Sequence, residues 1–97
     1  MALKTLPLDP ADLIETPEDV AMFLEDAFAE GNPPDIAHAL GTVARSRGLS
    51  ALAEQTGLSR QALHKALSPE GNPTLDTLLR VISALRLKLV VEPADPA

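Results

Sequence analysis

The chain has 97 residues and a mass of 10.2 kDa, the size of one domain with a single hydrophobic core. It contains no cysteine and only two histidines, so we expect neither disulfides nor a metal site, and no cofactor. No long apolar run is present, and the first residues do not place a charged segment before an apolar one. We therefore expect a cytoplasmic protein with no membrane partner.

The charges are divided unevenly along the chain, although their total is only −6. Residues 1–42 carry nine acidic residues against Lys4 alone, a net charge of −8. Residues 43–90 carry seven basic residues against three acidic ones, a net charge of +4. The split predicts an acidic half that repels DNA and a basic half that attracts it, with a different partner for each.

The first helix is predicted to follow an extended arm, residues 1–15, which contains two prolines. Thr16 can cap the first free N–H groups of a helix, and Pro17 suits the first helical position. The helix is predicted to run to about Glu30 and to stop at Gly31. Its buried stripe would consist of Val20, Phe23, Leu24, Ala27 and Phe28, which lie at helical spacing.

Four more helices are predicted. The second begins at Asn32, by the same capping argument, and ends near Gly48. Two short helices follow at Ser50–Thr56 and Ser59–Ala66, and the fifth begins near Thr74. The apolar residues of the fifth helix are Leu75, Leu78, Leu79, Ile82 and Leu85, again at helical spacing.

The last predicted element is a strand at Leu87–Glu92, where aliphatic and β-branched residues alternate with others. Because a lone strand leaves its edges unpaired, we expect it to pair with the same strand of a second copy, through Leu87, Leu89 and Val91. The predicted fold is therefore mainly all-α, with five helices and a C-terminal β-strand that pairs in a homodimer. The domain would span residues 16–92, between the arm at 1–15 and a tail at 93–97.

The segment 50–67 has the features of a helix-turn-helix. Gly57 can adopt the left-handed conformation of a tight turn, and Ser59 can cap the helix that follows. That helix is predicted to bury Ala62, Leu63, Ala66 and Leu67. Its outward residues would be Arg60, Gln61, His64 and Lys65. Such side chains can contact base edges in the major groove of DNA, while Ser59 suits a phosphate. The alternative is that this face is simply solvated.

The segment LAEQTGLSRQALHKALSPEGNPTLDTLLRVISALRLKL resembles the helix-turn-helix of Cro/C1-type (XRE) regulators. More narrowly, residues 14 to 92 resemble the antidote proteins of HigA-like addiction modules. The resemblance implies a five-helix domain, base contacts by the four outward residues, autorepression of the operon, and neutralisation of a RelE/ParE-superfamily (HigB-like) ribonuclease toxin. The operator would be an inverted repeat bound by a homodimer.

The sequence departs from many Cro-type proteins before the turn, where two residues that open the helix are missing. Ser50 would take over a phosphate contact there. The residues that we expect to add further phosphate contacts are Arg45, Arg47, Asn72 and Thr74.

A basic ribonuclease toxin would be complementary to the acidic half, so Glu18, Glu25 and Asp26 are the candidate toxin contacts, although their acidity could also serve solubility. His38 is expected to be a surface or partly packed residue, while His64 could contact DNA or merely cover its helix. No catalytic constellation or glycine-rich phosphate loop is present, so we expect neither an enzyme nor a small-molecule substrate. The remaining alternatives are a stand-alone repressor without a toxin, and a protein-interaction module that no longer binds DNA.

Overall fold

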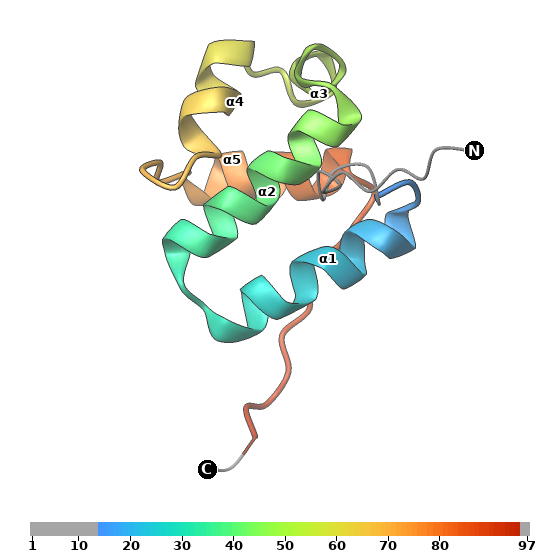
Figure 1. Ribbon diagram of the computed structural model, residues 1–97, viewed down its shortest axis with the longest axis vertical. Helices are drawn as coiled ribbons and strands as arrows, with labels where there is room; N and C mark the ends of the chain where they lie inside the picture. The colour runs from blue at the N-terminus through green and yellow to red at the C-terminus, as the bar shows by residue number, and fades with distance from the viewer. Residues whose placement is uncertain (1–13, 96–97) are drawn as a thin grey trace, which may run out of the picture.

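The computed structural model describes residues 14–95, and five helices make up its body (Figure 1). They are α1 (Pro17–Glu30), α2 (Pro33–Arg47), α3 (Leu49–Thr56), α4 (Arg60–Ala66) and α5 (Leu75–Ala84). All five helices predicted from the sequence are therefore confirmed. The predicted arm lies outside the described residues except for its last two positions. No helix within residues 14–95 has both the length and the apolar character needed to cross a membrane.

The start of α1 shows why the helix boundaries were predictable. The Oγ1 atom of Thr16 accepts a hydrogen bond from the N–H of Asp19 over 3.1 Å. In return, Oδ2 of Asp19 accepts from the N–H groups of Glu15 and Thr16, each over 3.1 Å. These two backbone hydrogen bonds hold the pKa of the Asp19 carboxyl below its usual value, because they stabilise the charged form. The capping box thus sets the first residue of α1.

The hydrophobic core lies between α2 and the other helices. Figure 1 shows α2 crossing the middle of the molecule, with α1 on one side and the α3–α4 pair on the other. Each helix contributes at least one fully buried side chain to this core, and these are Val20, Leu40, Val43, Leu52, Leu63 and Val81. The carbonyl oxygen of Ile14 accepts a hydrogen bond from Ser46 Oγ over 3.1 Å, so the residues before α1 are tied to α2. Helix α4 packs mainly against α3 and is anchored in the core through Leu63.

One prediction about a buried face is wrong. The spacing on α4 predicts Ala62 in the core, but this residue is exposed, and Leu63 is the one buried residue of this seven-residue helix. On α5, Ile82 is buried, whereas Leu75 and Leu79 are 68% and 46% exposed. Periodicity alone puts all of them on one stripe, but α5 is covered over only part of its circumference.

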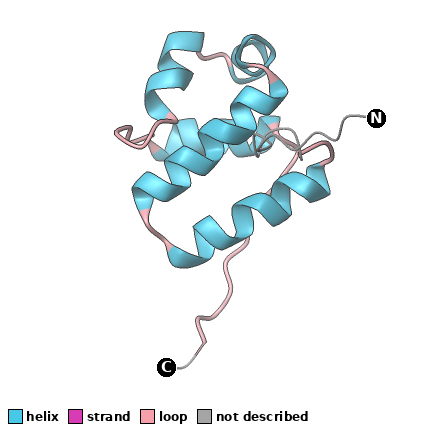
Figure 2. Cartoon of the chain, in the orientation of Figure 1, coloured by secondary structure: helices cyan, strands magenta, loops and turns pink. Residues whose placement is uncertain are grey.

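The predicted strand at Leu87–Glu92 is also wrong, since this segment has no regular secondary structure (Figure 2). A strand exists only when its backbone pairs with a neighbouring strand, and the described part of this chain contains none. The segment instead extends past α1, with Leu87 partly buried and Val91 97% exposed.

Candidate functional site

The outer face of α4 gathers polar side chains at the surface. Arg60, Gln61, His64 and Lys65 are all exposed, and helical spacing puts them on neighbouring rows of one face. The opposite face is anchored by Leu63, which is fully buried, and by Leu67 just after the helix, which is 5% exposed. Ser59 Oγ accepts a hydrogen bond from the N–H of Ala62 over 2.9 Å, which confirms that Ser59 caps α4. A short helix is thus held firmly with its polar face toward solvent.

The turn before α4 is fixed by hydrogen bonds that the sequence did not predict. Gly57 has a φ of 78°, which confirms the left-handed turn. The buried hydroxyl of Thr56 donates to the carbonyl oxygen of Leu52 over 2.8 Å and accepts from the N–H of Leu58 over 3.2 Å. Arg80 of α5 donates from Nη1 to the carbonyl oxygen of Thr56 over 3.1 Å. These bonds set the angle at which α4 leaves α3.

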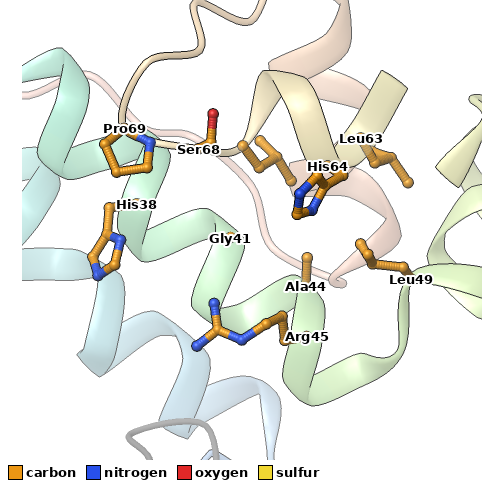
Figure 3. A pocket seen from close by; sticks show the side chains of 10 residues that line it. His38, Gly41, Ala44, Arg45, Leu49, Leu63, His64, Ser68 and Pro69 are labelled. Atoms are coloured by element: carbon orange, nitrogen blue, oxygen red, sulfur yellow. The ribbon is translucent and has the colours of Figure 1, made fainter. Parts of the chain in front are cut away.

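A pocket of about 280 Å³ lies between α2 and α4 (Figure 3). His38 and Arg45 reach it from α2, and His64 reaches it from α4. Its apolar floor consists of Gly41, Ala44, Leu49, Leu63 and Leu67, and Ser68 and Pro69 complete its wall. The structure thus brings together Arg45 and His64, both singled out from the sequence, and adds His38, which the sequence did not connect with either.

A second hollow joins the end of α4 to the loop that follows it. Lys65, Glu70 and Asn72 line this hollow together. A Cβ added at Gly71 would collide with the carbonyl oxygens of Lys65 and Ala66, so only glycine lets the loop pack so closely. The predicted contacts Lys65 and Asn72 therefore line the same hollow, together with Glu70.

The remaining predicted phosphate contacts are exposed at helix ends. Arg47 lies at the last position of α2, and Ser50 lies in the first turn of α3. Thr74 caps α5, since its Oγ1 accepts from the N–H of Thr77 over 3.1 Å. Its hydroxyl also donates to Thr77 Oγ1, over 3.1 Å. Thr74 therefore has an established structural role.

The acidic residues Glu18, Glu25 and Asp26 are exposed along α1. Figure 1 shows α1 on the far side of α2 from α4, so the acidic face and the polar face of α4 are separated. Met22 is 72% exposed and lies four residues after Glu18 and four before Asp26, which places it on the same stripe. Met22 was not among the residues predicted from the sequence, although this spacing could have singled it out.

Two comparisons with known proteins give matches, and each match covers most of the chain. The family model described as "Probable addiction module antidote protein" matches residues 4–93. A protein of Haemophilus influenzae described only as "Uncharacterized protein" is 39% identical over 84 residues, which cover 87% of each chain. No solved structure gives a significant match. Nearly the whole chain, with both the α1 face and the α4 face, is therefore shared with these relatives.

Proposed function

This chain belongs to the family of probable addiction module antidote proteins, and from that premise we propose that it is the antitoxin of a type II toxin-antitoxin module. In this proposal the protein binds its own operator DNA as a Cro/C1-type helix-turn-helix repressor. It also neutralises a ribonuclease toxin of the RelE/ParE superfamily (HigB-like).

The observation that carries DNA binding is the exposed polar face of α4, supported by the tightly bonded turn before it. In a helix-turn-helix the second helix enters the major groove, where arginine and lysine can bond guanine and glutamine can bond adenine. Arg60, Gln61 and Lys65 are exposed donors of these types. We assign base contacts to these three residues and to His64. No carboxylate belongs to the α4 helix itself, so its face does not repel an anionic duplex.

Phosphate contacts would surround this face. Arg45 and Arg47 at the end of α2, Ser50 in α3, and Ser59 at the start of α4 are all exposed near helix ends. Asn72 and Thr74 in the loop after α4 would extend the contacts along the backbone of the duplex. Contacts of this kind fix the position of a protein on DNA but do not select a sequence.

Toxin binding is assigned to the α1 face, with Glu18, Glu25 and Asp26 around Met22. A ribonuclease must attract an anionic substrate, so its surface is expected to be basic and complementary to these carboxylates. Met22 would supply the apolar centre that such interfaces need, since flexible methionine packs well against varied surfaces. Because α1 and α4 lie on opposite sides of α2, one molecule could hold toxin and DNA together.

We also propose that the protein acts as a homodimer on an inverted repeat, with half-sites about 34 Å apart. The exposed apolar side chains of Leu89 and Val91, with Leu87 beside them, would contribute to the contact between copies. Light scattering that shows a monomer at micromolar concentration, with undiminished operator binding after deletion of residues 87–97, would contradict this assignment.

The experiment that tests the function is co-purification with the product of the adjacent gene, followed by a band-shift assay on the upstream DNA. The proposal predicts a stable complex with a small basic protein and a specific shift. A shift without any toxin partner would indicate a stand-alone repressor instead. A partner complex without any shift would indicate a protein-interaction module that no longer binds DNA.

The division between the two faces has its own test, a triple reversal with Glu18→Lys, Glu25→Lys and Asp26→Lys. It should slow toxin association, most strongly at low salt, and leave operator binding intact or improved. Arg47→Glu is the matched reversal on the other face, and it should weaken operator binding while toxin association stays fast. If the triple reversal abolished operator binding and left toxin association unchanged, the assignment of the two faces would be wrong.

A further inference from the structure

Both histidines of this chain line the same pocket, although they are 26 positions apart in the sequence. His38 comes from the middle of α2 and His64 from the last turn of α4. Figure 3 shows the two imidazoles with the Arg45 guanidinium around Gly41 and Ala44. The pocket therefore gathers one guanidinium and two imidazoles in a protein whose net charge is −6.

The close approach of α2 and α4 is what brings these groups together. A Cβ added at Gly41 would collide with the carbonyl oxygen of Leu67, so the glycine lets the end of α4 lie directly against α2. The floor beneath the three side chains is apolar. An apolar floor lowers the local dielectric and strengthens the attraction between cationic groups and an anion above it.

The chemistry of the lining selects the class of ligand. Besides the two imidazoles and the apolar floor, the pocket is lined by Arg45 from α2, and by Ser68 and Pro69 from the loop after α4. None of the residues that line the pocket is acidic. A pocket of about 280 Å³ has room for a phosphate group, whose oxygens can accept from guanidinium, imidazolium and hydroxyl donors.

We propose that His38, Arg45 and His64 form a phosphate-binding pocket that takes a backbone phosphate of the operator, so that operator binding strengthens as the pH falls. The inference rests on the proposed DNA-binding function, because Arg45 and His64 belong to the assigned DNA interface, and it changes the assigned contact of His64 from a base to a phosphate. It adds His38 to that interface. Histidine side chains gain their positive charge between about pH 8 and pH 5, and a bound phosphate favours the charged form.

The test measures binding to a duplex of the upstream DNA at pH 8 and pH 6, in chloride buffers at constant ionic strength. The wild-type affinity should rise by about tenfold between pH 8 and pH 6. The double variant with His38→Gln and His64→Gln contains no histidine, and it should bind with the same affinity at both pH values. Arg47→Gln is the matched control, a cation of α2 outside the pocket, and it should bind more weakly but keep the rise.

A second arm separates the DNA backbone from free phosphate as the ligand. Inorganic phosphate alone, titrated at pH 6 and followed through the NMR resonances of the two imidazoles, should shift both at millimolar concentration, and the upstream duplex should displace it. Saturation by phosphate at micromolar concentration, without displacement by the duplex, would contradict the assignment to DNA. So would the absence of any shift at either imidazole.

The outcomes separate this inference from the proposed function. Specific operator binding without a change between pH 8 and pH 6 would overturn the phosphate pocket and leave the antitoxin function standing. A rise that persists in the variant without histidine would do the same. Failure of the wild-type protein to bind upstream DNA at either pH would overturn DNA binding itself.

Discussion

Arg80 donates a hydrogen bond from Nη1 to the carbonyl oxygen of Thr56, over 3.1 Å. Thr56 is the last residue of α3, and the carbonyl groups at the end of a helix lack partners within it. The same guanidinium pairs through Nε with Asp76, also over 3.1 Å. Helix α5 therefore supplies a cation to the negative end of α3 and supports the turn that orients α4.

Replacing Arg80 by methionine should remove this support while it keeps much of the aliphatic stem. Because the side chain is about half exposed, we expect the free energy of unfolding to fall by about 1 kcal/mol. Asp76→Asn is the control, since it removes only the exposed ion pair and should cost less than about 0.5 kcal/mol. Urea unfolding measures both, and equal losses would mean that the bond to Thr56 contributes nothing.

Thr42, in the middle of α2, is a matched control for the hydrogen bonds that the Thr56 hydroxyl makes at the turn. Both are buried helical threonines that donate to the carbonyl four residues earlier. Only Thr56 also accepts from a turn N–H, that of Leu58. Thr56→Val should therefore cost about 1–3 kcal/mol, because it leaves that N–H without its acceptor, whereas Thr42→Val should cost less than about 1 kcal/mol. Chemical denaturation that gives the same loss for both would refute this role of Thr56.

Gly41→Ala tests the close approach of α2 to the end of α4. In an open helix this change stabilises by about 1 kcal/mol. Here the new Cβ would collide with the carbonyl oxygen of Leu67. We therefore expect the free energy of unfolding to fall by about 1–3 kcal/mol and operator binding to weaken. Gly48→Ala is the control, since its Cβ would meet nothing within 4 Å, and it should cost about 1–2 kcal/mol of backbone strain without displacing α4. A Gly41→Ala variant more stable than the wild type would contradict the packing described here.

The pH dependence of stability should report the capping box of α1. The hydrogen bonds from Glu15 and Thr16 lower the pKa of Asp19 in the folded protein. The stabilisation is therefore present above the pKa of the unfolded chain and is lost as the pH falls through the lower, folded pKa. Asp19→Asn should lose less stability than the wild type on acidification from pH 5 to pH 3, as measured by thermal unfolding. The control Glu25→Gln, on the middle of the same helix, should follow the wild-type profile.

Local sequence signals predicted the helices because each boundary depends on residues close to it. Thr16, Ser59 and Thr74 cap helices by bonding groups three positions away, which a sequence displays directly. The bond between Arg80 and Thr56 spans 24 positions, and it depends on how α3 and α5 pack. That His38 and His64 line one pocket depends in the same way on how α2 and α4 pack.

The strand prediction at Leu87–Glu92 failed for a different reason. Its residue types have strand propensity, but strand structure is a property of a pair, and no partner strand exists among the described residues. The exposed leucines of α5 likewise show that spacing identifies one face of a helix without telling how much of that face is covered.

The most direct measurement for DNA recognition by α4 compares the wild type with Arg60→Ala on the upstream duplex and on a random duplex, in the same salt. We predict that Arg60→Ala costs about 1–3 kcal/mol on the upstream duplex and much less on the random one, because base contacts carry sequence preference. Arg47→Ala should weaken both equally and reduce the salt dependence, because a phosphate contact does not select a sequence. Equal losses on the two duplexes for Arg60→Ala would contradict the assignment of the α4 face to base edges.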